Sequence, residues 1–225
     1  MPREGRRSQG TASQETCFAL STFFLAGVSR VLRRVFTGVP YMFNARTTSL
    51  ILIVLAAAAT RLLPHPPNMT TITALALFGG ATLADRRLAF GVPLLAMLLA
   101  DLVLASISSA SVISWQAHLV EQYLPLAAVV VLGFALRGRR APLRVLTATL
   151  AGSLLFFALS NFGVWMAEGL YPKTGEGLVA CYVAAIPFLA NSLAGDLAYA
   201  ALLFGGLALL ERRFSVLREP QASAA

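Results

Sequence analysis

Long apolar stretches alternate with short polar and basic segments along most of the chain. Six stretches are almost free of charge, at about residues 47–63, 69–84, 88–108, 120–136, 145–167 and 178–210. A helix needs about 20 mostly apolar residues to cross a bilayer. The pattern therefore predicts an all-α fold, a polytopic bundle of six transmembrane helices. The last stretch is longer than one crossing requires, so it either tilts, bends at Pro187 or begins in an outer loop.

The composition supports a membrane protein. Of the 225 residues, 57% are hydrophobic and only 12% are charged, whereas a soluble domain carries about 25% charged residues. The net charge of +8 does not indicate nucleic-acid binding, because the basic residues sit at the ends of apolar stretches and form no continuous face. We expect the lipid bilayer as a partner and no nucleic acid.

The first 46 residues form a separate basic extension. Residues 1–16 are polar, which predicts disorder. Residues 17–36 hold about a dozen apolar residues followed by arginines, which favours an interfacial amphipathic helix. A signal peptide and a true translation start at Met42 remain alternatives. The predicted organisation is an extension over 1–46, a six-helix transmembrane domain over 47–213 and a cytoplasmic tail over 214–225.

The basic residues predict the orientation. If the N-terminus is cytoplasmic, sixteen of the eighteen Lys and Arg residues lie on the cytoplasmic side, and only Arg61 and Lys173 lie outside. Cytoplasmic loops of membrane proteins are enriched in Lys and Arg. An even number of spans with both ends in the cytoplasm follows, in the cell inner (plasma) membrane.

The segment RLLPHPPN, residues 61–68, interrupts two apolar stretches with three prolines. Proline lacks a backbone donor and disfavours helix before it, so the first span should stop here and be followed by a tight outer turn. Asn68 is placed to cap the second helix. The turn either only connects the two spans or also covers a binding cavity.

A stripe of small residues follows in the second span. Ala76, Gly80 and Ala84 recur every four residues and would share one helix face. Such a stripe lets another helix approach closely. It predicts either packing inside the bundle or docking to a separate membrane subunit.

Polar residues inside the spans mark the candidate binding site. Asp101 and Asp196 have no evident basic partner within a span, and ionisable residues there usually face a cavity or another polar group. Together with deep asparagines and outer aromatic residues they could line an outward-opening pocket for a small molecule. The predicted substrate-binding residues are Asn68, Asp101, Trp115, Tyr123, Asn161, Trp165, Tyr182, Asn191 and Asp196. Each could instead serve only as a helix contact or interfacial anchor.

No pattern of residues points to catalysis. Cys17 and Cys181 are far apart, as are His65 and His118, and none has metal-ligand spacing. The chain carries no Gly-rich phosphate loop, no HExxH and no nucleophile elbow. We expect no enzyme activity, no cofactor and no metal.

Four motifs carry a family resemblance: PNMTTITALALFGG, LAFGVPLLAMLLADLVL, FFALSNFGVW and PFLANSLAGDLAYAALLFG. Over about residues 50–210 the chain resembles a bacterial integral membrane family that is assigned to transport without established biochemistry. In architecture it is more distantly similar to the S components of energy-coupling-factor transporters. S components present Ala-xxx-Ala on their first span to a coupling subunit. Here the first span has an Ala56–Ala59 run instead, and the small stripe lies on the second.

Three functions follow from these patterns. The first is the substrate-binding component of an uptake system for a vitamin-like nutrient, which would need a membrane coupling subunit with ATPases. The second is a stand-alone secondary transporter that uses Asp101 and Asp196 as proton or cation sites. The third is a membrane scaffold without transport activity, in which the polar residues only hold helices together.

Overall fold

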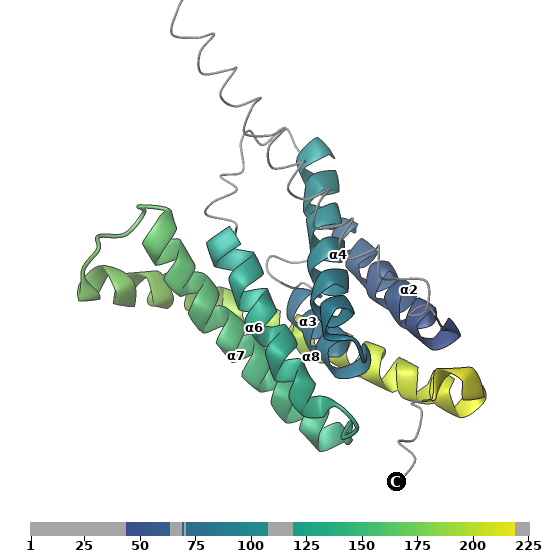
Figure 1. Ribbon diagram of the computed structural model, residues 1–225. Helices are drawn as coiled ribbons and strands as arrows, with labels where there is room; N and C mark the ends of the chain where they lie inside the picture. The colour runs from purple at the N-terminus through teal and green to yellow at the C-terminus, as the bar shows by residue number, and fades with distance from the viewer. Residues whose placement is uncertain (1–43, 64–68, 70, 108–118, 219–225) are drawn as a thin grey trace, which may run out of the picture. The chain divides into compact units, whose positions relative to one another are not determined.

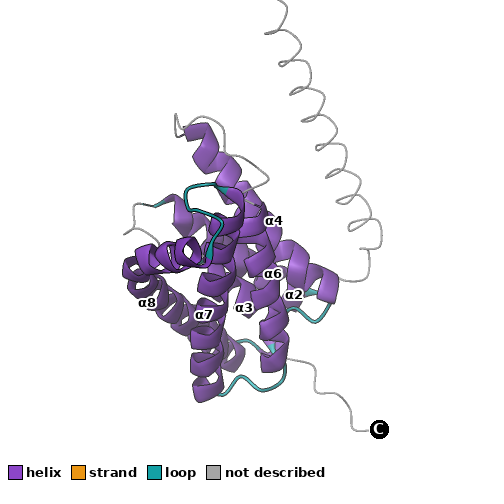
Figure 2. Ribbon diagram, turned by 90° about the vertical axis from the view of Figure 1, so that its left-hand side faces the viewer, coloured by secondary structure: helices purple, strands orange, loops and turns teal. Residues whose placement is uncertain are grey.

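The computed structural model describes residues 44–63, 69, 71–107 and 119–218, and every regular element in these ranges is helical (Figures 1 and 2). The elements are α2 (Ala45–Ala59), η1 (Thr60–Leu62), α3 (Ile72–Thr82), α4 (Arg86–Ile107), η2 (Leu119–Tyr123), α6 (Leu124–Gly133), η3 (Phe134–Leu136), α7 (Pro142–Ala167), α8 (Gly175–Arg213) and η4 (Ser215–Leu217). They belong to one compact unit, Ala45–Ala225. The all-α prediction is confirmed for the described residues. The interfacial helix over 17–36, the start at Met42 and the proline-rich turn lie outside them.

Four helical segments of the described chain are long and apolar enough to cross a membrane: Ala45–Leu62, Arg86–Ser106, Pro142–Ala167 and Gly175–Arg213. Their outer faces carry large apolar side chains in contact with the surroundings, such as Leu52, Leu143 and Leu202, which are 60%, 71% and 65% exposed. A face of this kind suits hydrocarbon rather than water. Two further apolar segments, Ile72–Thr82 and Glu121–Leu136, are shorter.

The short helix α3 is the centre of the bundle. All eleven of its residues are buried, and it contacts α2, α4, α6, α7 and α8. The two ribbon views both place it among the other helices (Figures 1 and 2). A helix that is apolar all round belongs in a protein interior. The expected second span is therefore a core helix of about 16 Å, enclosed by these five helices.

Small residues allow α3 and α6 to pack backbone against backbone. A Cβ atom added at Gly133 would lie 2.6 Å from the carbonyl oxygen of Leu77 and 3.0 Å from the Cα of Gly80. One added at Gly80 would collide with the carbonyl oxygen of Val130. Ala76 is also fully buried. Two members of the small stripe thus face other helices of this chain, whereas Ala84 lies beyond the end of α3 and is exposed.

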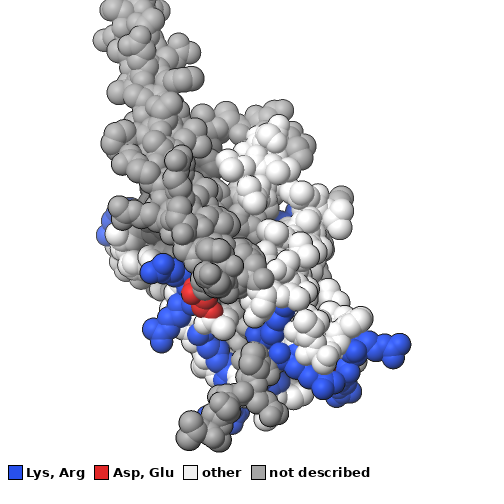
Figure 3. Space-filling model, turned by 45° about the vertical axis from the view of Figure 1, so that its right-hand side comes forward, with Lys and Arg blue, Asp and Glu red and all other residues white. Residues whose placement is uncertain are grey.

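Arginine side chains connect separate segments at one end of the bundle. Arg46 at the start of α2 donates to the carbonyl of Leu217 in η4 at 3.0 Å. Arg140, before α7, forms an ion pair of 3.2 Å with Glu211 near the end of α8. Figure 3 shows Lys and Arg gathered over the lower part of the face that it draws. We call this the arginine-rich end.

Arg137 closes α3 at the same end. Its guanidinium donates to the carbonyls of Gly80, Leu83 and Ala84 at 2.9, 2.8 and 3.2 Å, and it lies 4.3 Å from the ring centroid of Phe134. The last carbonyls of a helix have no partner within the helix. A cation there also complements the negative end of the helix dipole. Arg137 therefore caps a helix end that lies inside the protein.

The last apolar region is one continuous helix. Thr174 caps α8 by accepting a bond from the amide of Gly177 at 3.2 Å, and Arg212 and Arg213 lie in its last turn. Pro187 lies inside the helix without ending it. At 39 residues α8 is about 58 Å long, far longer than the hydrocarbon core of a bilayer. The helix must therefore tilt or project beyond the membrane.

Candidate functional site

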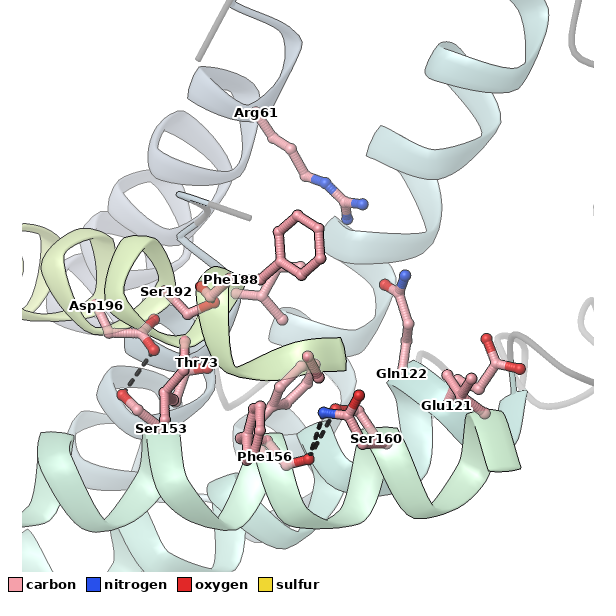
Figure 4. Close-up of a pocket in the computed structure, with 16 residues that line it drawn as sticks. Arg61, Thr73, Glu121, Gln122, Ser153, Phe156, Ser160, Phe188, Ser192 and Asp196 are labelled. Atoms are coloured by element: carbon pink, nitrogen blue, oxygen red, sulfur yellow. Dashed lines mark hydrogen bonds between the residues drawn. The ribbon is translucent and has the colours of Figure 1, made fainter. Parts of the chain in front are cut away.

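A cavity of about 270 Å³ lies where α3 begins. Its walls come from η1, α3, η2, α7 and α8 (Figure 4). The lining residues are Arg61, Ile72, Thr73, Glu121, Gln122, Ser153, Phe156, Phe157, Ser160, Asn161, Val164, Ala185, Phe188, Leu189, Ser192 and Asp196. On α7 and α8 these residues recur every three or four positions, so each helix contributes one face.

The shortness of α3 explains why the cavity exists. Ile72 and Thr73, the first residues of α3, form part of its lining. The neighbouring α7 and α8 have 26 and 39 residues, so they continue past the point where α3 starts. Space that a full-length helix would fill is left open between them.

Asp196 faces the start of α3. It is only 3% exposed, and it accepts a hydrogen bond of 2.7 Å from the hydroxyl of Ser153. The Thr73 hydroxyl and the backbone amide of Ala74 also hydrogen-bond to this carboxyl group. The first amides of a helix lack partners within it and carry partial positive charge. Asp196 therefore caps α3 from a neighbouring helix, and it does so on the wall of the cavity.

Arg61 lines a different part of the cavity and is held by a second acid. Its guanidinium forms an ion pair of 3.0 Å with Asp101, whose carboxylate also accepts a hydrogen bond of 2.9 Å from the Tyr123 hydroxyl. Asp101 is 4% exposed. The sequence suggested no basic partner for Asp101 within a span. The structure supplies one from the end of the first span, because η1 packs against α4.

Glu121 and Gln122 line the cavity, and each has a buried oxygen without a hydrogen-bond partner in the described part of the chain. Glu121 is 9% exposed, and its Oε1 has no hydrogen-bond partner; the same holds for Oε1 of Gln122. The other side of the Glu121 carboxyl lies within hydrogen-bonding reach of Glu168 at the end of α7.

Phenyl rings separate these polar groups. Phe156 and Phe157 on α7 face the cavity, as does Phe188 on α8. In Figure 4, Phe188 lies between Arg61 and Gln122 on one side and Asp196 with Ser153 on the other. Apolar walls with a few placed polar groups are the usual composition of a small-ligand site.

The predicted site residues separate into three groups. Asn161 and Asp196 line the cavity, while Asp101 and Tyr123 adjoin it through Arg61. Trp165, Tyr182 and Asn191 are absent from its lining: Trp165 donates to the carbonyl of Pro172, and Tyr182 to that of Ala158. Asn68 and Trp115 lie outside the described residues.

Sequence reasoning also missed part of the lining. The predicted site residues include none from η1 or α3, but the cavity takes Arg61, Ile72 and Thr73 from these elements and none of its lining from α4. Arg61 stood out as one of only two basic residues on the predicted outer side, which was a usable signal. Glu121 gave a weaker one, because it precedes an apolar helix that carries no acid.

The helices described above indicate a broad class of protein. The described part of the chain is all-helical, and four of its helices are long and apolar enough to cross a membrane, which is compatible with a multi-pass membrane protein. More narrowly, it belongs to DUF6580, a family of unknown function whose model matches residues 41–221. Comparison with curated proteins and with solved structures finds no match. Among the described residues, no group of three or more His, Cys, Asp or Glu side chains could hold a metal ion.

Proposed function

We propose that this protein is the substrate-binding component of an uptake system for a small nutrient in the bacterial inner membrane. The observation that carries the proposal is the cavity at the start of α3, with its apolar walls and buried polar groups. At about 270 Å³ it suits a compact molecule, at the lower end of the range for ligand pockets.

The proposal keeps the six predicted membrane segments, of which α3 crosses only part of the bilayer inside the bundle, with both ends in the cytoplasm. Arg46, Arg137 and Arg140 each bridge segments at the arginine-rich end, which would be cytoplasmic. The Arg61–Asp101 pair, Glu121 and Glu168 belong to the opposite ends of their helices and would lie toward the outside. The cavity would then open to incoming substrate. Energy would come from a membrane coupling subunit with ATPases, because the sequence has no phosphate-binding loop of its own.

Filling the cavity tests this function. Ala185 lines the cavity, whereas the adjacent Ala184 is exposed and does not. The full chain and its Ala185→Phe and Ala184→Phe variants would be purified gently from the native host, and retained small molecules identified by mass spectrometry. We expect a compound bound to the wild type and to Ala184→Phe but lost from Ala185→Phe. Equal retention by both variants would show that the cavity is not the binding site.

One observation supports a second candidate, a stand-alone cation-coupled transporter. Asp196 lies deep in α8, and no described basic residue forms an ion pair with it. Buried carboxyl groups in spans often carry protons or cations. Uptake by the purified chain alone in liposomes, driven by an imposed proton gradient, would favour this candidate. Uptake that appears only with a coupling complex would favour the first.

A further inference from the structure

We infer that the ligand of this cavity carries a positively charged nitrogen, as a compact organic ammonium does. This inference rests on the proposed binding function and names the chemical class of its substrate. It follows from the charges and unpartnered atoms of the lining.

The first argument is the balance of charge around the cavity. Among the described lining residues Arg61 is the one basic side chain, and it forms an ion pair of 3.0 Å with Asp101. Asp196 and the Glu121–Glu168 pair have no basic partner among the described residues. The lining therefore has an excess of negative charge. An anionic ligand would meet repulsion there, whereas a cation would replace the missing partner.

The second argument concerns hydrogen bonding. Oε1 of Glu121 and Oε1 of Gln122 are buried acceptors without a donor. Buried polar atoms are normally satisfied, and an exception at a pocket wall indicates a missing partner. Both atoms accept hydrogen bonds, so the missing group is a donor or a cation. Ammonium compounds supply either, because an N–H donates directly and a quaternary nitrogen offers positively polarised methyl groups.

The third argument is the aromatic wall. Phe156, Phe157 and Phe188 line the space between the two acidic groups. The face of a phenyl ring attracts a desolvated cation, and aromatic walls are a common way to hold quaternary ammonium groups. The carboxyl groups can bind the positive charge of a compact molecule, and the phenyl rings between them can bind its apolar surface.

Three probes of the same shape separate charge from fit. Choline is cationic, 3,3-dimethylbutan-1-ol replaces its nitrogen with carbon, and 3,3-dimethylbutanoate is the anionic counterpart. The full chain in lipid nanodiscs would be heated with each probe at millimolar concentration, since a bound ligand raises Tm. We expect Tm to rise with choline and to stay unchanged with the neutral and anionic probes.

Variants assign the effect to the cavity. Asp196→Asn and Glu121→Gln keep the size of each side chain and remove its charge, and each should weaken choline binding by more than about tenfold. Glu211→Gln makes the same change on α8 outside the cavity and should leave binding unchanged. If one acidic variant fails to fold, the other still tests the inference. Unchanged choline affinity in a folded Asp196→Asn or Glu121→Gln would overturn it.

The outcomes also separate this inference from the function on which it rests. An equal or larger rise in Tm with the neutral or anionic probe would overturn the inference of a cationic ligand. It would leave the proposed binding function intact. A neutral or anionic compound retained from the host would do the same. No response to any probe, together with no compound retained from the host, would remove both proposals.

Discussion

At each end of α3 a charged side chain complements the helix dipole, but the surroundings of the two ends differ. At its C-terminal end, the guanidinium of Arg137 donates to three carbonyls, and none of these residues lines the cavity. At its N-terminal end, the Asp196 carboxyl accepts bonds from Ser153 and from the first turn, but a cavity remains beside it. A charge that complements a helix dipole is therefore not in itself a sign of function. Open space and unpartnered atoms beside the charge distinguish the second end from the first.

The largest expected effect comes from removing the C-terminal cap. Arg137→Ala removes three hydrogen bonds from a charged group to carbonyls, and the two to Gly80 and Leu83 are half-buried. Such bonds contribute about 1.5–3 kcal/mol each, so we expect a loss of at least about 3 kcal/mol in the free energy of unfolding. Denaturation by sodium dodecyl sulfate in mixed micelles would measure it. The exposed neighbour Arg139 provides the control, since Arg139→Ala should change little. Similar losses in both variants would refute a specific capping role for Arg137.

The packing of α3 on α6 should be nearly as sensitive. In Gly80→Ala the new methyl group would meet the backbone of Val130, which cannot move aside without shifting a helix. Overpacking of this kind costs about 1–3 kcal/mol. Gly205→Ala on α8 is the matched control, because nothing lies within 4 Å of its added methyl group. Thermal unfolding in detergent should show a lower Tm for the first variant and an unchanged or higher Tm for the second. A tolerated Gly80→Ala would contradict the close approach of these helices.

A smaller effect distinguishes two threonines at the ends of α3. Thr82 donates to the carbonyl of Phe78 at 2.7 Å, whereas the buried Oγ1 of Thr71 has no hydrogen-bond partner. Thr82→Val should therefore cost about 1 kcal/mol, and Thr71→Val should be neutral or stabilising by a similar amount. Chemical denaturation of the two variants side by side would measure the difference. A larger loss for Thr71→Val would mean that its hydroxyl has a bonding partner in the membrane.

Hydrophobic patterning predicted the helices well, because a run of apolar residues without charge has few alternatives in a membrane. The predicted stretch 178–210 corresponds to the helix Gly175–Arg213, and 145–167 corresponds to the helix Pro142–Ala167. The pattern did not reveal that α3 would be wholly enclosed. Membrane spans and buried core helices are both apolar all round, so the sequence cannot distinguish the two when the helix is short.

The site was harder to predict, because partners far apart in the sequence define it. Asp196 was identified because an ionisable side chain in an apolar helix carries a free-energy cost. Its contacts with Ser153 on α7 and with the start of α3 depend on helix packing. Arg61 and Asp101 are likewise 40 residues apart, and only Asp101 was predicted to belong to the site. Trp165 and Tyr182 were predicted to bind substrate, but their polar atoms donate to the carbonyls of Pro172 and Ala158 instead.

The enclosure of α3 also constrains how the protein is made. Eleven residues span only about half of the hydrocarbon layer, so this segment gains too little to partition into lipid by itself during synthesis. The helices α6, α7 and α8, which pack around α3, leave the ribosome later. Insertion of α3 should therefore be completed only after the downstream helices arrive. A chain truncated before α6 should leave this segment accessible to water-soluble labelling reagents.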